Sequence, residues 1–101
     1  MLRIMEVAAA ISDPIRRRVL ELVRDRELPA GELAAAFDVS RPAVSRHLRV
    51  LREAGLVQER REGRLRLYRA DPAPLRELRD WLDDYWSGRL EALKRVAEGE
   101  R

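Results

Sequence analysis

Arginine supplies almost all of the positive charge of this chain, and much of it lies in one stretch. Residues 40–70 carry nine arginines against three glutamates, a net charge of +6, whereas the whole chain of 101 residues carries +3. A guanidinium group donates paired hydrogen bonds that suit phosphate oxygens and the edge of guanine. The stretch therefore predicts binding to a polyanion such as nucleic acid, although charge alone would also fit a solvated surface.

Two predicted elements would present these arginines to a partner. Residues 40–54 predict a helix, because Ser40 is a good N-terminal cap and Gly55 is a common residue just beyond a helix end. Apolar residues recur along one face of this helix, at Val44, Leu48 and Leu51. Residues 56–69 predict a β-hairpin, because apolar and basic residues alternate in its second half and Gly63 suits the turn.

The side chains of these two elements divide into two expected roles. Arg41, Ser45 and Arg46 are expected to read base edges, because they lie in the first turns of a helix that would enter the major groove. The other polar residues of the helix and hairpin are expected to hold phosphates: Ser40, Arg49, Arg60, Arg61, Arg64 and Arg66.

Three further helices follow from apolar spacing. Helices are indicated over residues 2–11 and 14–25, and Asp13-Pro14 offers a cap followed by a residue that fits the first turn. A similar pair, Asp71-Pro72, opens a last helix over 72–97. These helices would surround the basic pair of elements and supply its hydrophobic support.

A short helix over 32–37, reached through a turn at Pro29, precedes the arginine-rich helix. Residues 30–54 then have the spacing of a helix-turn-helix, and the hairpin at 56–69 follows as a wing. We therefore predict one mainly α domain over 1–101 with a small β-hairpin, a winged helix-turn-helix.

The last helix carries more apolar and aromatic surface than a peripheral helix needs. We predict that this surface forms the interface of a dimer, through Leu78, Trp81, Leu82, Tyr85, Trp86, Leu90 and Leu93. A pocket for an apolar effector between two subunits is the alternative use of the aromatic residues.

Three strings in the sequence match a known family. They are SDPIRRRVLELV from residue 12, GELAAAFDVSRPAVSRHLRVLREAGLV from residue 31 and REGRLRLYRAD from residue 61. Together they resemble the bacterial ArsR/SmtB family of repressors. The resemblance implies a homodimer that pairs its first and last helices, which adds Ile4, Val7 and Ile11 to the expected interface. It also implies that the dimer binds an inverted repeat in double-stranded DNA and blocks transcription until an effector intervenes. The residues do not identify the effector.

The sequence departs from the metal sensors of that family. Their thiolate site would fall in residues 32–37, which contain no cysteine, and their last-helix site uses histidines that are absent here. Asp80, Asp83 and Asp84 fit a solvated face better than a metal site, because transition metals favour softer ligands. We therefore predict a regulator without metal or cofactor.

His47, the only histidine, has two interpretations. It is a candidate for phosphate contact or pH sensing, or it bonds locally beside the core. It does not form a nucleophilic pair with Ser45, because side chains two apart on a helix point in different directions. Nothing in the sequence asks for catalysis.

The composition excludes some other classes of protein. The chain has no cysteine, so it holds no disulfide, which fits a reducing cytoplasm. Arg3 and Glu6 interrupt the N-terminal apolar residues, so neither a signal peptide nor a membrane span is expected. The remaining alternative to a DNA-binding regulator is a winged-helix module that binds only protein.

Overall fold

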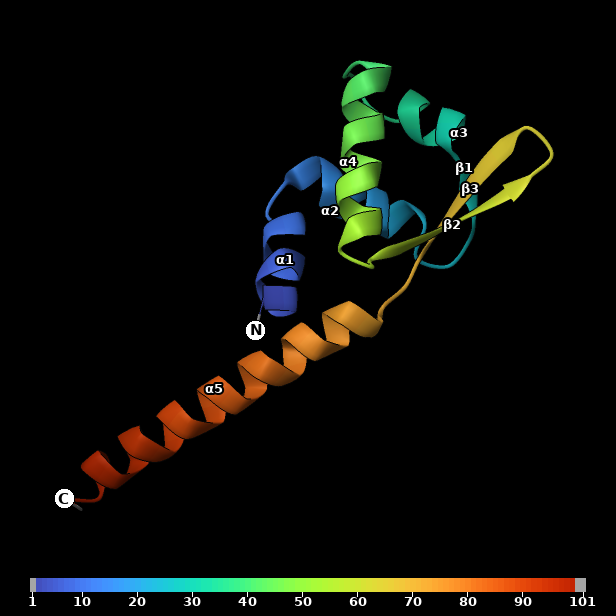
Figure 1. Ribbon diagram of the computed structural model, residues 1–101. Coiled ribbons are helices and arrows are strands. Elements are labelled where there is room, and N and C mark those ends of the chain that lie inside the picture. The colour runs from blue at the N-terminus through green and yellow to red at the C-terminus, as the bar shows by residue number, and fades with distance from the viewer. Residues whose placement is uncertain (1, 100–101) are drawn as a thin grey trace.

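The computed structural model describes residues 2–99, which form a mainly helical structure with a small antiparallel sheet (Figure 1). The elements are α1 (Leu2–Ala10), α2 (Pro14–Leu22), β1 (Leu28–Pro29), α3 (Ala30–Ala35), α4 (Arg41–Glu53), β2 (Val57–Glu62), β3 (Leu65–Ala70) and α5 (Ala73–Ala97). This order confirms the predicted fold class. The ends of the predicted 1–101 domain, residues 1, 100 and 101, lie outside the described residues.

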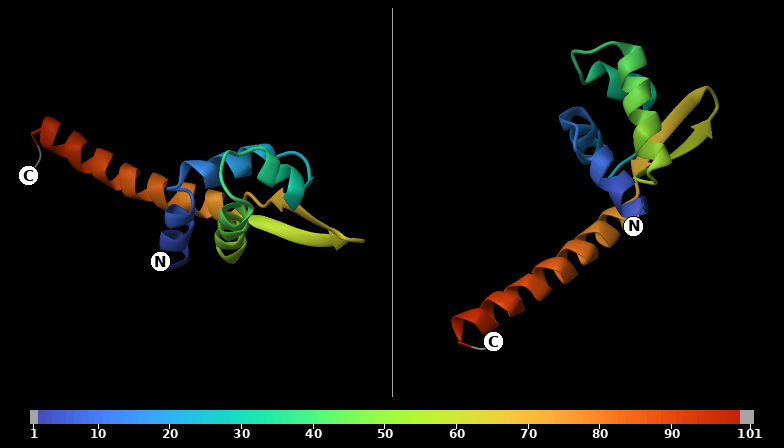
Figure 2. Two further views of the ribbon diagram at one scale, coloured as in Figure 1. Left: turned by 90° about the horizontal axis from the view of Figure 1, so that it is seen from above. Right: turned by 60° about the vertical axis from the view of Figure 1, so that its left-hand side comes forward.

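Helices α1–α4 and the sheet form a body from which α5 extends as a long rod (Figures 1 and 2). The extents of the molecule are 64 × 25 × 23 Å. A straight helix of 25 residues is about 37 Å long, so α5 accounts for much of the longest dimension. The hairpin β2–β3 projects from the body away from α5 (Figure 1).

Two predicted N-terminal caps, Asp13 and Ser40, are present at the starts of α2 and α4. Asp13 Oδ1 accepts hydrogen bonds from the backbone N–H groups of Ile15 and Arg16, at 2.8 and 3.1 Å. Ser40 Oγ accepts one from the N–H of Ala43 at 3.2 Å. Side-chain oxygens thus satisfy N–H groups that have no partner within the helix, and fix where α2 and α4 begin.

The ends of α4 and of the hairpin turn depend on glycine. Gly55 and Gly63 have φ of 75° and 61°, a region that residues with a side chain rarely adopt. Gly55 follows the last turn of α4, and Gly63 connects the two strands. The strands pair antiparallel from Val57 opposite Ala70 to Glu62 opposite Leu65. Both glycine predictions are confirmed.

Three local expectations need correction. Helix α2 ends at Leu22 rather than near residue 25, and α3 spans 30–35 rather than 32–37. The segment between them includes the unpredicted strand β1, in which Leu28 and Pro29 pair with β3. A two-residue strand has no periodicity to detect, and its pairing draws the chain onto the sheet before α3 starts.

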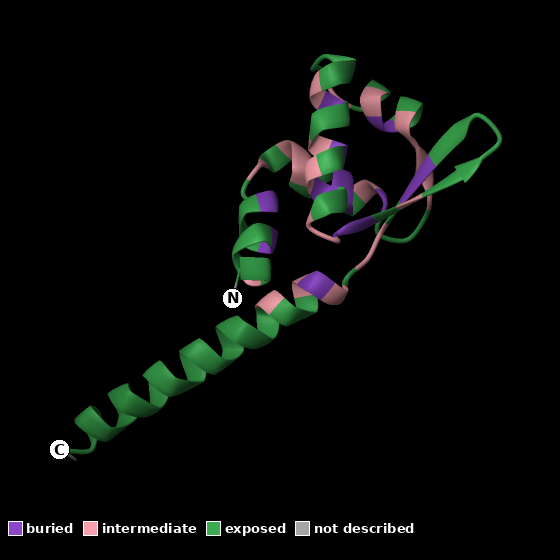
Figure 3. Cartoon of the chain, viewed as in Figure 1, coloured by how far each residue is buried: buried purple, intermediate pink, exposed green. Residues whose placement is uncertain are grey.

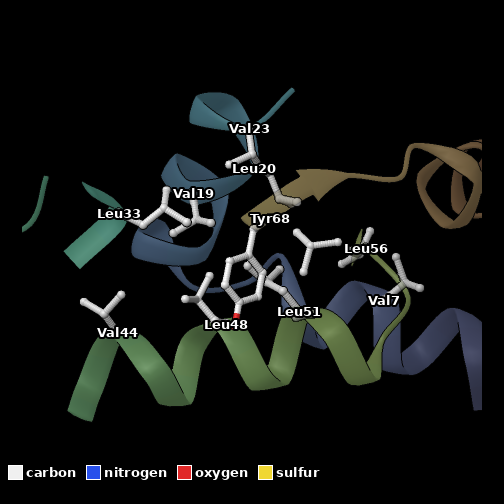
Figure 4. Close-up of a cluster of buried hydrophobic side chains, with 12 residues drawn as sticks. Val7, Val19, Leu20, Val23, Leu33, Val44, Leu48, Leu51, Leu56 and Tyr68 are labelled. Carbon is white, nitrogen blue, oxygen red and sulfur yellow. The ribbon is translucent and has the colours of Figure 1, made fainter. Parts of the chain in front are cut away.

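The core lies between α2, α4 and the sheet, with contributions from α1 and α3 (Figure 4). Its fully buried side chains include Val19, Leu33, Leu51 and Leu56. Val7 was expected at a dimer interface, but it is 1% exposed and belongs to this core. Because α1 packs this side chain inward, Val7 has no surface left to offer a partner.

Candidate DNA-binding surface

Helix α4 is divided between an apolar face and a polar face. Val44, Leu48 and Leu51 are buried in the core. The residues expected to read bases or hold phosphates from this helix are all exposed: Ser40, Arg41, Ser45, Arg46 and Arg49. A helix held to the body by one face and basic on the other has the shape and charge that fit a major groove.

The hairpin presents all four of its predicted arginines to solvent, and Arg60 among them is 54% exposed. Arg61, Arg64 and Arg66 are exposed, and Arg64 lies beside the turn. Arg61 and Arg66 lie directly opposite each other in the register of β2 and β3. Like charges in this arrangement weaken a sheet. Their presence here is therefore better explained by an anionic partner than by folding.

Helix α4 and the hairpin meet at a groove of about 390 Å³. Its polar lining comes from Ser45, Arg46, Arg49, Arg52, Arg66 and Tyr68, and its apolar lining from Ala30, Pro42 and Leu48. The structure thus brings together predicted residues from both elements. Four guanidinium groups around one groove make a site suited to a phosphate oxygen.

Arg60 differs from the other hairpin arginines, because it is engaged within the chain. Its Nε and Nη2 donate to the two carboxylate oxygens of Glu27, each at 2.8 Å, and Nη2 also donates to Glu62 at 3.1 Å. The hydrogen bond and charge of Glu27 raise the pKa of Arg60. Arg60 thus links the hairpin to the segment after α2, and its expected contact with a phosphate stays a prediction.

A second ion pair, missed by the sequence reasoning, lies where α4 meets the hairpin. Glu59 Oε2 accepts hydrogen bonds from Arg52 Nη1 at 3.0 Å and from the Tyr68 hydroxyl at 2.8 Å. The Tyr68 bond and the charges of Arg52 and Arg66 outweigh partial burial and lower the pKa of Glu59. Burial and the bond to Glu59 raise the pKa of Tyr68. Alternation in β2 and β3 is the only sequence signal that could have paired Glu59 with Tyr68.

His47 points to the α2 side of α4 rather than to the exposed basic face. Its Nδ1 lies 3.2 Å from Arg16 Nη1 and 4.0 Å from Asp13 Oδ1, and its side chain is largely buried. Burial opposes ionisation of Asp13, but the N–H groups of Arg16 and Ile15 and the neighbouring positive charges lower its pKa. These contacts favour the local role of His47 over phosphate contact.

The other expected interface residues are more accessible than Val7. Ile4, Ile11 and Leu78 are half-buried, while α5 is exposed from Arg79 to its end (Figure 3). Trp86 and Leu90 are 56% and 59% exposed. The rings of Trp81 and Tyr85 stack at 5.8 Å, Tyr85 and Trp86 meet edge to face at 6.2 Å, and the Arg89 guanidinium lies 5.2 Å above Tyr85. The outer part of α5 therefore carries an ordered aromatic surface.

The described residues also bear on metal binding and on membrane insertion. Among residues 2–99, no three histidine, cysteine, aspartate or glutamate side chains gather where they could hold a metal ion. Residues 32–37 contain no cysteine and α5 contains no histidine, so the residues present do not fit the metal sites of the family's metal sensors. None of the helices described is both long and apolar enough to cross a membrane.

The comparisons with known proteins agree with this geometry. Residues 13–59 match the family described as "Bacterial regulatory protein, arsR family". The chain is 42% identical to the HTH-type transcriptional regulator Rv2034 of Mycobacterium tuberculosis, over 90% of this chain and 85% of that protein. It is 34% identical to the transcriptional repressor SdpR of Bacillus subtilis, over 75% and 84%.

A solved structure supports the same assignment. The ArsR-like transcriptional regulator from Rhodococcus sp. RHA1 superposes with a TM-score of 0.78 at 33% identity, covering 95% of this chain and 93% of that one. Sequence and fold thus agree over nearly the whole length. The chain belongs to the ArsR family, a family of DNA-binding transcriptional regulators rather than enzymes.

Proposed function

We propose that this chain is a transcriptional repressor that binds an inverted-repeat operator as a homodimer. The observation that carries the proposal is the basic surface on which α4 and the hairpin converge. Arg46 and Arg49 from α4 and Arg66 from β3 line one groove between the two elements. A helix in the major groove with a hairpin against the adjacent backbone would use all three.

The exposed face of α5 supports a dimer. Apolar and aromatic side chains run along it at helical spacing, at Trp81, Leu82, Tyr85, Trp86, Leu90, Leu93 and Val96. A continuous apolar surface of this kind is costly in water and marks an interaction site. The resemblance to the ArsR/SmtB family implies a homodimer, so a second copy of this chain is the proposed occupant. Ile4 of α1 and Ile11, just after α1, lie at the edge of the proposed interface.

A two-fold dimer dictates the form of the operator. Two copies of α4 about 34 Å apart would reach successive major grooves on one side of the DNA. The two half-sites must then be related by the same two-fold axis as the protein, which makes the operator an inverted repeat. Arg41, Ser45 and Arg46 are the proposed base-reading residues, and Ser40, Arg49, Arg61, Arg64 and Arg66 the proposed phosphate ligands.

Repression is the proposed outcome of binding. Relatives of this chain include a protein named transcriptional repressor SdpR. Occupation of a promoter by a dimer would block transcription directly, without metal or cofactor. The proposal includes residues 1–101 as one functional domain that acts in the cytoplasm.

Selection of bound fragments from the source genome tests the proposal. We expect the purified chain to enrich fragments that share an inverted repeat with half-sites about 10–10.5 base pairs apart, centre to centre. A chain that enriches no DNA at low salt, yet captures a protein, would support the winged-helix protein-binding module instead. Salt-sensitive retention on random DNA is the simpler first measurement.

A further inference from the structure

Glu59 is an unexpected residue at the edge of a surface built to bind phosphate. It lies on β2, and its carboxylate contacts Arg52, which lines the groove between α4 and the hairpin. A carboxylate beside a phosphate site repels the ligand and lowers its affinity. Its position therefore calls for a compensating role.

The contacts of Glu59 indicate what that role is. One oxygen, Oε2, accepts both the Arg52 Nη1 bond at 3.0 Å and the Tyr68 hydroxyl bond at 2.8 Å. Tyr68 is buried in the core and lies directly opposite Glu59 in the sheet. Arg52 lies in the last turn of α4. A single atom thus joins the end of the helix to both strands of the hairpin.

The environments of the two charged groups differ. The Glu59 side chain is 18% exposed, whereas that of Arg52 is 46% exposed. The carboxylate is therefore a largely enclosed anchor, and the guanidinium keeps free donors on its outer side. A guanidinium has five N–H donors, so one bond to Glu59 leaves others for a phosphate.

We propose that Glu59 is a positioning residue for DNA binding: it holds Arg52 in the groove between α4 and the hairpin, where Arg52 donates to a backbone phosphate. The inference rests on the proposed function, since it names a ligand and a support within the same DNA-binding surface. It adds Arg52 to the proposed phosphate ligands and explains why the Glu59 carboxylate lies beside a basic groove.

The test uses the fact that repulsion and positioning predict opposite changes in DNA affinity when the carboxylate of Glu59 is removed. Removal of a carboxylate tightens binding to DNA if the charge acts only by repulsion, but weakens binding if the carboxylate positions Arg52. The variants are Glu59→Ala, Glu59→Gln, Arg52→Gln and the double variant Arg52→Gln/Glu59→Ala. Gln keeps one carbonyl oxygen that accepts both bonds, while it removes the charge. Glu91→Ala, which removes an exposed carboxylate on α5, is the matched control.

The readout is fluorescence anisotropy with a random-sequence duplex of about 30 base pairs, or three turns of DNA, over a range of salt concentrations. All titrations are run below the onset of thermal unfolding measured for each variant by circular dichroism. Glu59→Ala is expected to raise Kd by about fivefold to tenfold, as for the loss of one coupling within a hydrogen-bonded network. Glu59→Gln is expected to bind as tightly as the unchanged chain or more tightly.

Arg52→Gln is expected to make the slope of log K against log salt shallower by about 0.9, the value for one phosphate contact. In that background, Glu59→Ala should no longer weaken binding, because the two changes remove the same interaction. Three results would overturn the inference: Glu59→Ala binding as tightly as the unchanged chain, equal weakening by Glu59→Gln, or undiminished weakening in the Arg52→Gln background. Absence of DNA binding by the unchanged chain at low salt would instead overturn the proposed function.

Discussion

Arg16 Nη1 lies 3.2 Å from His47 Nδ1, so a side chain at the start of α2 contacts α4, the helix proposed to enter the major groove. The same guanidinium donates from Nε to the carbonyl of Ala10 at 2.6 Å and from Nη2 to that of Ala9 at 3.2 Å. Arg16 therefore links the C-terminal end of α1 to α4. A guanidinium can only donate, so this contact is a hydrogen bond when Nδ1 of His47 carries no proton.

Arg16→Ala should destabilise the chain, because it leaves two carbonyl groups at the end of α1 and the ring of His47 without this donor. We expect a loss of about 1–3 kcal/mol in the free energy of unfolding, measured by urea denaturation. Arg18→Ala is the control, since Arg18 forms an exposed pair with Glu21. Equal stability of the two variants would show that the Arg16 contacts contribute nothing to the fold.

Acid should destabilise the chain through three carboxyl groups. Asp13, Glu27 and Glu59 have pKa values below their ordinary values of 3.8, 4.5 and 4.5. A carboxyl with a lowered pKa in the folded state stabilises the fold above its unfolded-state pKa, and this contribution is lost as pH falls through the folded-state pKa. The melting temperature should therefore decrease as the pH is lowered below about 4.5.

The matched variant for this prediction is Glu27→Gln/Glu59→Gln. It should show a smaller fall in melting temperature between about pH 5 and pH 3, because only Asp13 of the three groups still titrates. If the melting temperature of this variant falls as steeply as that of the unchanged chain, other groups control stability in acid.

Much of the fold could be predicted from the sequence because its signals are local. Asp13 and Ser40 cap helices within three residues of themselves, and Gly55 and Gly63 mark turns by their own conformations. The apolar spacing in α4 also predicted which face is buried. These features depend on neighbours in the chain, which a sequence displays directly.

The rest depends on contacts between distant segments. Arg60 meets Glu27 across 33 positions, so its pairing with this carboxylate had no local signal. Val7 fits the apolar pattern of α1 equally well for a core or an interface, and only packing distinguishes them. No sequence signal distinguishes Arg52 from the other arginines, and only the fold places Glu59, with Tyr68 bonded to it, beside Arg52.

Arg46→Ala and Arg64→Ala should weaken DNA binding in different ways. Arg46 is proposed to read a base edge, so its loss should cost about 1–3 kcal/mol on the operator and relax sequence preference. Arg64 is proposed to contact phosphate, so its loss should weaken all sequences alike and make the salt slope shallower by about 0.9. Competition titrations with specific and random DNA separate the two effects. If both variants show the same sequence preference and the same salt slope, Arg46 and Arg64 do not have the separate roles proposed.

Trp86→Glu should prevent dimerisation while the body of the protomer stays folded. Trp86 is 56% exposed in the single chain, so the change leaves the core intact but puts a charge in the proposed interface. We expect a monomer by size-exclusion chromatography with unchanged helical structure up to α5. Val7→Ala is the contrasting variant, because a change in the core should lower stability without altering the interface chemistry. A dimer that survives Trp86→Glu would place the interface elsewhere.

Sedimentation velocity of the chain mixed with its selected genomic fragment tests the central claim most directly. Two copies of α4 and the hairpin on one inverted repeat require two chains per duplex, and the complex should dissociate as salt is raised. A chain that sediments as a monomer and leaves the fragment free at low ionic strength would contradict a dimeric DNA-binding regulator.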